Sequence, residues 1–202
     1  MAPTPGQLVI ISGPSGAGKS SIVKRLLNEC GLPLTLSVSA TTRDPRPAEV
    51  DNVHYHFLSD EEFRKRREAG EFLECCEVFG RGHWYGTLKH EVAASLKAGK
   101  WVILEIDVQG AMKVIEGDFP DAISIFVRPD SMDELERRLR TRATESEDSI
   151  QRRLETARHE LEYEKKYSHS LINDTLDQTV EDICELLNDI QDTIHKKDNT
   201  DA

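Results

Sequence analysis

The sequence contains Gly13-Pro14-Ser15-Gly16-Ala17-Gly18-Lys19-Ser20, which fits the phosphate-loop pattern G-x-x-x-x-G-K-[ST] at every specified position. An uninterrupted apolar run, Leu8 to Ile11, comes directly before it and is typical of a strand covered on both faces. From Ser21 to Asn28 the apolar side chains fall on one helical face. Glycines let successive main-chain N–H groups converge on phosphate oxygens, and the helix N-terminus adds positive potential. We therefore expect a nucleoside triphosphate site in which Lys19 reaches the outer phosphates and the Ser20 hydroxyl binds Mg²⁺.

The length and composition favour a single α/β domain with inserted segments. A chain of 202 residues buries about 70% of its unfolded surface. No apolar run approaches the roughly 20 residues that span a bilayer, and the first five residues lack a basic, then apolar, signal pattern. We expect a cytoplasmic protein without a membrane partner. The cysteines show no C-x-x-C spacing, so we interpret them as reduced thiols rather than metal ligands.

The distribution of charge indicates small anionic substrates rather than nucleic acid. A net charge of −11 argues against a surface that must neutralise many phosphates. The region from residue 174 to the end alone holds nine acids and two lysines. Arginines instead gather locally, at 43–46, 64–67 and 137–153.

Strand and helix patterns alternate along the chain. Further strands are predicted at 34–39, 54–58, 72–78, 101–107 and 122–127, with a last one ending at 171–173. Helices are predicted at 59–69, 87–98, 108–115, 131–140, 148–166 and 179–195, the second of them capped by Thr87. The prolines and arginines of 40–47 argue against a regular element there. This alternation predicts a P-loop, three-layer α/β/α fold with a mostly parallel sheet. We divide it into core segments 1–37, 89–140 and 154–202, an insertion 38–88 and a short mobile lid 141–153.

The insertion carries motifs that resemble those of guanylate kinases. They are the runs 37–46, 70–74, 85–87 and 105–110 together with Tyr55, in the order and spacing of that family. The resemblance covers about residues 7–190 and implies a nucleoside monophosphate kinase of purine nucleotide metabolism. Such an enzyme transfers the γ-phosphoryl group of ATP to GMP with Mg²⁺ as cofactor, and dGMP is left open as a second acceptor.

The same resemblance assigns the acceptor site. By matching position, the residues implied to bind GMP are Ser39, Arg43, Arg46, Tyr55, Glu74, Tyr85, Thr87 and Asp107. The two arginines and two tyrosines would hold the phosphate, for which guanidinium groups are well shaped. Glu74 would accept from guanine N1–H and the exocyclic amine, Asp107 would help at the amine, and Ser39 and Thr87 would serve O6. Adenine has an acceptor at N1, so a carboxylate there would repel it.

The resemblance also assigns the catalytic groups. Arg138, Arg142 and Arg153 of the lid would join Lys19 in neutralising the charge on the transferred phosphoryl group. Neighbouring arginines at 137, 140 and 152 are interpreted as helix-surface charges. Asn173, at the end of the last strand, would contact the adenine of ATP. We expect each nucleotide to close its own segment and so exclude water.

Two segments depart from the family pattern. The loop 80–84 is longer than the usual G-N-x-Y-G form, which leaves the position of Tyr85 open. Thr141-Arg142-Ala143 stands where G-R-G is common, so the lid hinge is expected to be stiffer.

Each assigned residue also has a purely structural interpretation. Arg43 and Arg46 could be solvated surface, Glu74 an exposed strand residue, Tyr55 a packing residue and Asp107 a helix cap. Two other functions stay open: a kinase of this fold with another phosphorylated acceptor, such as ribose bisphosphate, and a non-catalytic scaffold module. The guanine-reading set argues against the former and the intact phosphate loop against the latter.

Overall fold

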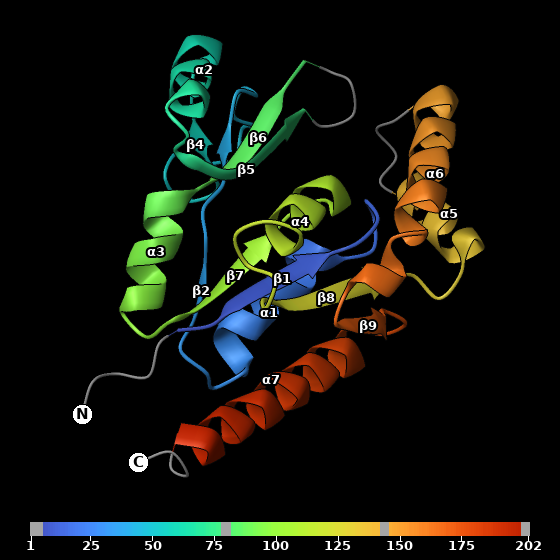
Figure 1. Cartoon of the computed structure of the whole chain (residues 1–202). Coiled ribbons are helices and arrows are strands. Elements are labelled where there is room, and N and C mark those ends of the chain that lie inside the picture. Colours follow the sequence, from blue (N-terminus) through green and yellow to red (C-terminus); the bar gives the residue numbers. More distant parts are fainter. Residues whose placement is uncertain (1–5, 78–81, 142–145, 199–202) are drawn as a thin grey trace. The chain divides into compact units, whose positions relative to one another are not determined.

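The computed structural model describes residues 6–77, 82–141 and 146–198, and the chain folds into two compact units (Figure 1). The first unit comprises Met1–Ser12 and Thr35–Ile125, and the second comprises Gly13–Leu34 and Phe126–Ala202. None of the helices within the described ranges is long and apolar enough to cross a membrane.

The first unit is built on parallel strands that are buried on both faces. Strand β1 (Leu8–Ser12) pairs in parallel with β7 (Trp101–Glu105), and β2 (Leu34–Leu36) is the other neighbour of β7. Every side chain of β1 is buried, as the continuous apolar run predicts. Helix α3 (Lys89–Lys97) contacts β7, and α4 (Val108–Ile115) contacts β1.

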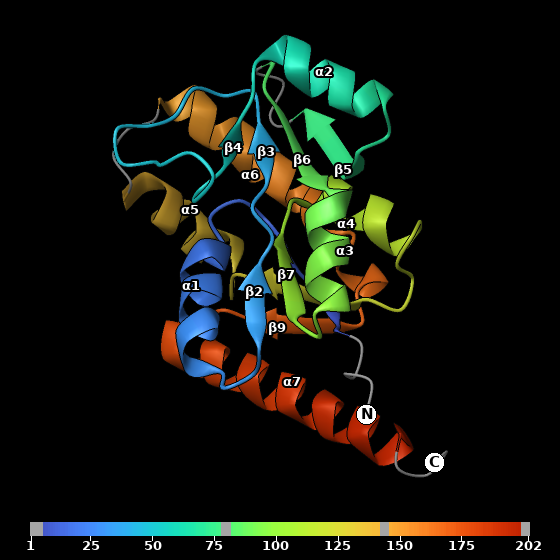
Figure 2. The same ribbon diagram turned by 90° about the vertical axis from the view of Figure 1, so that its left-hand side faces the viewer.

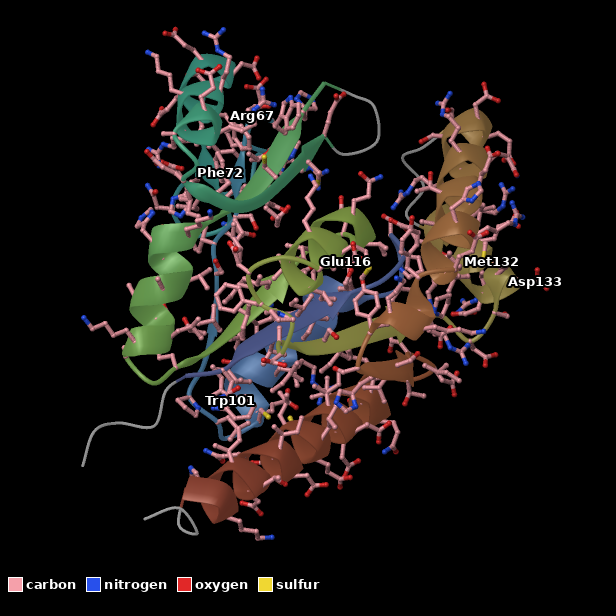
Figure 3. All side chains as sticks on the ribbon, in the orientation of Figure 1. Arg67, Phe72, Trp101, Glu116, Met132 and Asp133 are labelled. Carbon is pink, nitrogen blue, oxygen red and sulfur yellow. The ribbon has the colours of Figure 1, made fainter. Side chains whose placement is uncertain are left out.

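A second, mixed sheet of the first unit has the strand order β4-β3-β6-β5. Its strands are β3 (Ala40–Thr41), β4 (His56–Phe57), β5 (Phe72–Glu77) and β6 (Trp84–Leu88). Helix α2 (Asp60–Glu68) covers this sheet (Figure 2), with Phe63 stacked on Phe72 at 4.4 Å between ring centroids. Arg67, which Figure 3 labels beside Phe72, lies 4.5 Å over the ring of Trp84. These contacts form an apolar core separate from that of β1 and β7.

The second unit contains the phosphate loop and most of the helices. Its neighbouring strands are β8 (Ile123–Arg128), which begins in the first unit, and β9 (His169–Ile172). Its helices are α1 (Lys19–Glu29), α5 (Met132–Thr141), α6 (Glu147–Leu161), the short 3-10 turn η1 (Glu164–Lys166) and α7 (Leu176–Asp198). Helix α7 runs against α1, and α5 packs on α6. Leu135, Leu139 and Leu154 are fully buried between α5 and α6.

The observed elements correct several predicted boundaries. Ala40–Thr41 forms strand β3, although we expected no regular element there. Thr87 lies within β6 instead of capping a helix, because its hydroxyl bonds to a buried side chain of β5, and α3 begins two residues later. The predicted helix 148–166 ends at Leu161, and the last helix begins three residues earlier than expected. The division into core, insertion and lid stays a prediction.

Candidate functional site

The phosphate loop joins β1 to α1 as the motif predicts. Gly18, with φ of 95°, is the N-cap of α1, and Ser20 is exposed in the first turn. The Lys19 ammonium curls back over the loop, donating to the carbonyl oxygens of Gly13 at 2.6 Å and Pro14 at 3.0 Å. The positive end of α1 and the Lys19 charge therefore lie at the same loop, which suits a polyphosphate.

Asn173 is buried against this loop. Its side-chain nitrogen donates to the carbonyl oxygen of Ala17 at 2.6 Å, and its side-chain oxygen accepts from the Thr179 hydroxyl at 3.1 Å. A Cβ at Gly18 would lie only 2.4 Å from that nitrogen, so the approach requires a glycine. The amide nitrogen thus binds the loop, and the amide oxygen is held in place by Thr179. The predicted contact with adenine stays a prediction.

Two of the three lid arginines contact the same region. Arg153 donates to the Ser15 hydroxyl at 2.7 Å, and Arg138 donates to the main-chain oxygen of Asn173 at 2.7 Å. Their neighbours Arg137 and Arg140 instead form ion pairs on exposed helix surface. Arg142 lies outside the described residues. Arg138 and Arg153 thus contact the phosphate loop or the Asn173 segment beside it, and their predicted catalytic role stays a prediction.

Glu74 is a buried carboxyl group facing a threonine across two strands. It lies on β5 opposite Thr87 of β6, is 6% exposed, and accepts from the Thr87 hydroxyl at 2.8 Å. Its other oxygen lies against Gly110, where a Cβ would come within 2.8 Å. Burial raises the pKa of Glu74 to about 7, and the nearby charge of Asp107 adds to this, while the Thr87 hydrogen bond opposes it. The exposed-strand interpretation of Glu74 is therefore wrong.

Asp107 has both of its oxygens occupied. One caps α4 by accepting from the Gly110 N–H at 2.7 Å, and the other accepts from the Cys76 thiol at 3.2 Å. The capping interpretation is confirmed, and the residue also lies beside Glu74. Burial raises the pKa of the Cys76 thiol, so it stays protonated and acts as a donor.

Three of the four expected phosphate ligands of the acceptor are in contact with one another. Arg43 donates through Nε to the Tyr85 hydroxyl at 3.1 Å, and its guanidinium lies 5.3 Å from the centroid of the Tyr55 ring. The rings of Tyr55 and Tyr85 meet edge to face at 5.8 Å. Burial raises the pKa of the Tyr55 hydroxyl, which stays a proton donor. Arg46 is exposed three residues beyond Arg43.

The remaining expected positions are also defined by the strand register. Tyr85 pairs with Thr41 on one side and Cys76 on the other, so the longer loop does not displace it from the sheet. Residues 80 and 81 of that loop lie outside the described residues. Ser39 is half-buried next to β3, and its carbonyl oxygen accepts from the His56 N–H at 2.9 Å.

Sequence reasoning missed three side chains at these sites. Glu49 pairs with Arg43, Cys76 donates to Asp107, and Thr179 supports Asn173. An acid within the arginine-rich segment was a signal for Glu49. No local sequence pattern indicates a role for Thr179, because its partner, Asn173, lies at the end of β9 and not on the same helix.

The residues present fit a magnesium ion carried by a nucleotide. Within the described residues no group of three His, Cys, Asp or Glu side chains could enclose a metal. Mg²⁺ commonly keeps several waters and binds substrate phosphates with only one or two protein oxygens. Ser20, exposed at the start of α1, is such an oxygen donor.

The family model and the most similar relatives that were found belong to one family. A family model described as guanylate kinase matches residues 5–190. A guanylate kinase of Rhodopirellula baltica is 57% identical over 189 residues, which cover 94% of this chain and 90% of that relative. One of Caldanaerobacter subterraneus is 49% identical over 88% of this chain and 84% of its own length. The crystal structure of guanylate kinase from Anaplasma phagocytophilum has a TM-score of 0.76 at 30% identity, covering 95% of this chain and 89% of that one. This likeness confirms the expected α/β fold with a mostly parallel sheet.

Proposed function

The chain belongs to the guanylate kinase family, and we propose that it transfers the γ-phosphoryl group of ATP to GMP, giving ADP and GDP, through the residues described above. The observation that carries the choice of acceptor is the buried Glu74 carboxyl group with its Thr87 partner. Guanine offers two neighbouring donors, N1–H and the exocyclic amine, and an ionised carboxylate accepts both. Asp107 adds a further acceptor next to it.

The phosphate of GMP binds to the polar cluster on the mixed sheet. Arg43, Arg46, Tyr55 and Tyr85 provide charge and hydroxyl donors there. Ser39 donates to guanine O6, and Thr87 does so by turning its hydroxyl proton from Glu74 to O6 when GMP binds. A nucleoside without a phosphate would make no charge-assisted hydrogen bonds to these donors, so the site favours a nucleotide. The same cluster and carboxylates accept dGMP in principle, because none of the assigned contacts uses the ribose 2′-hydroxyl.

ATP binds with its phosphates on the loop 13–20. Lys19 would exchange its contacts with the loop carbonyls for the outer phosphate oxygens, and the Ser20 hydroxyl would be the protein ligand that holds Mg²⁺. When bound, the metal neutralises phosphate charge and orients the terminal group. Asn173 is the proposed neighbour of the adenine.

Phosphoryl transfer depends on in-line positioning and on charge stabilisation more than on covalent chemistry. Lys19, Arg138, Arg142 and Arg153 supply the positive charge, with Arg142 and Arg153 carried by the lid 141–153 and Arg138 by α5 just before it. We propose that ATP closes this lid and that GMP closes the insertion 38–88, which excludes water from the reacting phosphates. Both substrates are polyanions of the cytoplasm, where we place the reaction.

A coupled assay of ADP release tests the function directly. The purified chain with ATP and Mg²⁺ should turn over GMP, and dGMP more slowly or equally, at rates far above those with AMP, CMP or UMP. Equal rates with AMP and GMP would remove the role given to Glu74. Turnover of ribose bisphosphate but not of GMP would favour a different acceptor, and the absence of any turnover would favour a binding module.

A further inference from the structure

The segment from Arg43 to Glu49 is organised around the Glu49 carboxylate. The two Glu49 oxygens accept from the two terminal nitrogens of Arg43 at 2.8 and 2.9 Å. One of them also accepts from the Arg46 main-chain N–H at 2.7 Å, and the Glu49 N–H returns a bond to the Arg46 carbonyl at 2.9 Å. Prolines at 45 and 47 remove two main-chain donors from this segment. Hydrogen bonds to the Glu49 carboxylate, and not regular secondary structure, therefore hold the conformation of the segment 43–49.

This ion pair differs from the exposed pairs on the helices. The Arg43 and Glu49 side chains are only 14% and 16% exposed, and the contact is bidentate. Two parallel N–H···O bonds fix the orientation of a guanidinium as well as its position. The bonds from Arg43 and from the Arg46 main chain lower the pKa of Glu49 to about 2. Glu49 is thus ionised, and accepts only, at every pH at which the protein is expected to work.

The pair also determines which atoms face an incoming phosphate. Arg43 uses Nε on the Tyr85 oxygen and both terminal nitrogens on Glu49, and one of the terminal nitrogens also donates to the Asp44 carbonyl oxygen at 2.6 Å. Since the Tyr85 oxygen accepts from Arg43, its own proton points elsewhere and is available to an anion. The Arg46 main chain is held by the same carboxylate while its side chain stays exposed. Fixing Glu49 therefore fixes Arg43, Tyr85 and Arg46 together.

We propose that Glu49 is a positioning residue for the acceptor nucleotide, holding the phosphate-binding cluster in its binding geometry before GMP arrives. The inference rests on the proposed function, because it names the phosphate of GMP as the ligand of that cluster. A carboxylate this close to a phosphate also repels it. The positioning effect is the larger one, because three N–H donors of a segment with two prolines lose their acceptor when Glu49 is removed.

The test compares Glu49→Gln and Glu49→Ala with the wild-type chain in steady-state assays. Loss of charge-assisted hydrogen bonds should raise KM for GMP about tenfold in Glu49→Gln and about a hundredfold in Glu49→Ala. KM for ATP and the melting temperature of Glu49→Gln should stay close to wild type. Glu62→Gln is the matched control, because Glu62 pairs with Arg66 on the exposed side of α2 in the same unit. It should change neither KM.

Each other result has a definite meaning. A lower KM for GMP in Glu49→Gln would show that the carboxylate competes with phosphate, and it would overturn the proposal. An unchanged KM for GMP with a lower melting temperature would show a role in folding alone, which also overturns it. Wild-type protein that is inactive with GMP would refute the proposed function instead. The inference fails by itself when the wild type is active and the Glu49 variants match it. Calorimetric titration with GMP, in the absence of ATP, measures the same ratios without turnover.

Discussion

The side-chain amide of Asn173 donates to the Ala17 carbonyl oxygen at 2.6 Å, and this bond ties the end of β9 to the phosphate loop. The amide oxygen is fixed in turn by the Thr179 hydroxyl of α7. Because the donor and acceptor ends have different partners, the orientation of the amide is determined by its surroundings. A residue expected to read adenine is thereby also a support for the residues that bind phosphate.

Asn173→Asp tests this support with almost no change in shape. It replaces the donor by an acceptor facing the Ala17 carbonyl, so we expect a loss of about 2 kcal/mol in the free energy of unfolding. KM for ATP should rise, because the loop loses its fixed position. Asn188→Asp is a suitable control, since Asn188 donates to a carbonyl of α7 on an exposed surface. Thermal denaturation and ATP kinetics would check both variants. A change only in the preference for ATP over GTP would indicate adenine reading without loop support.

The pH dependence of GMP binding should report the ionisation of Glu74. Its pKa is raised to about 7 mainly by burial, with Asp107 adding to the shift and Lys113 opposing it. Since only the carboxylate accepts both guanine donors, KM for GMP should rise about tenfold per unit as the pH falls below 7. A protonated Glu74 can donate to adenine N1, so the ratio of AMP to GMP turnover should increase in the same range. A KM for GMP that stays constant from about 1.5 pH units below that pKa to about 1 unit above it would contradict this assignment.

The ionisation of Glu74 should also affect the free energy of unfolding. This free energy should fall as the pH rises, whereas GMP binding should become stronger. The folded pKa lies above the ordinary value of 4.5, so the folded chain holds the proton more tightly than the unfolded chain. The contribution of this group to the free energy of unfolding is therefore present at low pH and is lost as the pH rises through 7. Glu74→Gln should remove this loss, and without GMP it should melt at a higher temperature than wild type at pH 8. Chemical denaturation at pH 5 and pH 8 would measure the difference.

Arg153 and its neighbour Arg152 provide an internal comparison for the lid. Arg153 contacts Ser15 of the phosphate loop, whereas Arg152 is exposed on α6. Arg153→Ala should lower kcat by about a hundredfold or more, because it removes charge that the transferred phosphoryl group needs. Arg152→Ala should keep kcat within about twofold of wild type, as expected of a surface charge. Similar losses in both variants would mean that overall charge matters, rather than the contact with the loop.

The sequence predicted those parts of the site that depend on local patterns. The phosphate loop has a fixed spacing, and the buried run of β1 has only one plausible arrangement in an α/β fold. The positions of Glu74 and Arg43 came from family motifs of similar specificity. In each case neighbouring residues along the chain carry enough information to place the side chain.

Features formed by contacts between distant segments could not be predicted. Thr87 is a good helix cap by local preference, and only its strand pairing with Glu74 shows that its hydroxyl is used elsewhere. Asn173 and Thr179 are in contact because one residue directly follows β9 and the other lies in the first turn of α7. An acid so close to Arg43 is a signal for Glu49, yet the loop between the two residues has no periodic pattern from which their pairing could be inferred.

The strand position of Thr87 has a further consequence for α3. That helix begins after Leu88, which is buried and gives no side-chain cap, and the first N–H of the helix, that of Lys89, donates instead to the Glu71 carbonyl oxygen at 2.9 Å. A missing cap typically costs a helix about 1 kcal/mol. Leu88 cannot be exchanged for a capping residue without losing its place in the core beside Phe63 and Phe72. Thr87 and Leu88 are thus used for the bond to Glu74 and for the apolar core, and neither is available to cap α3.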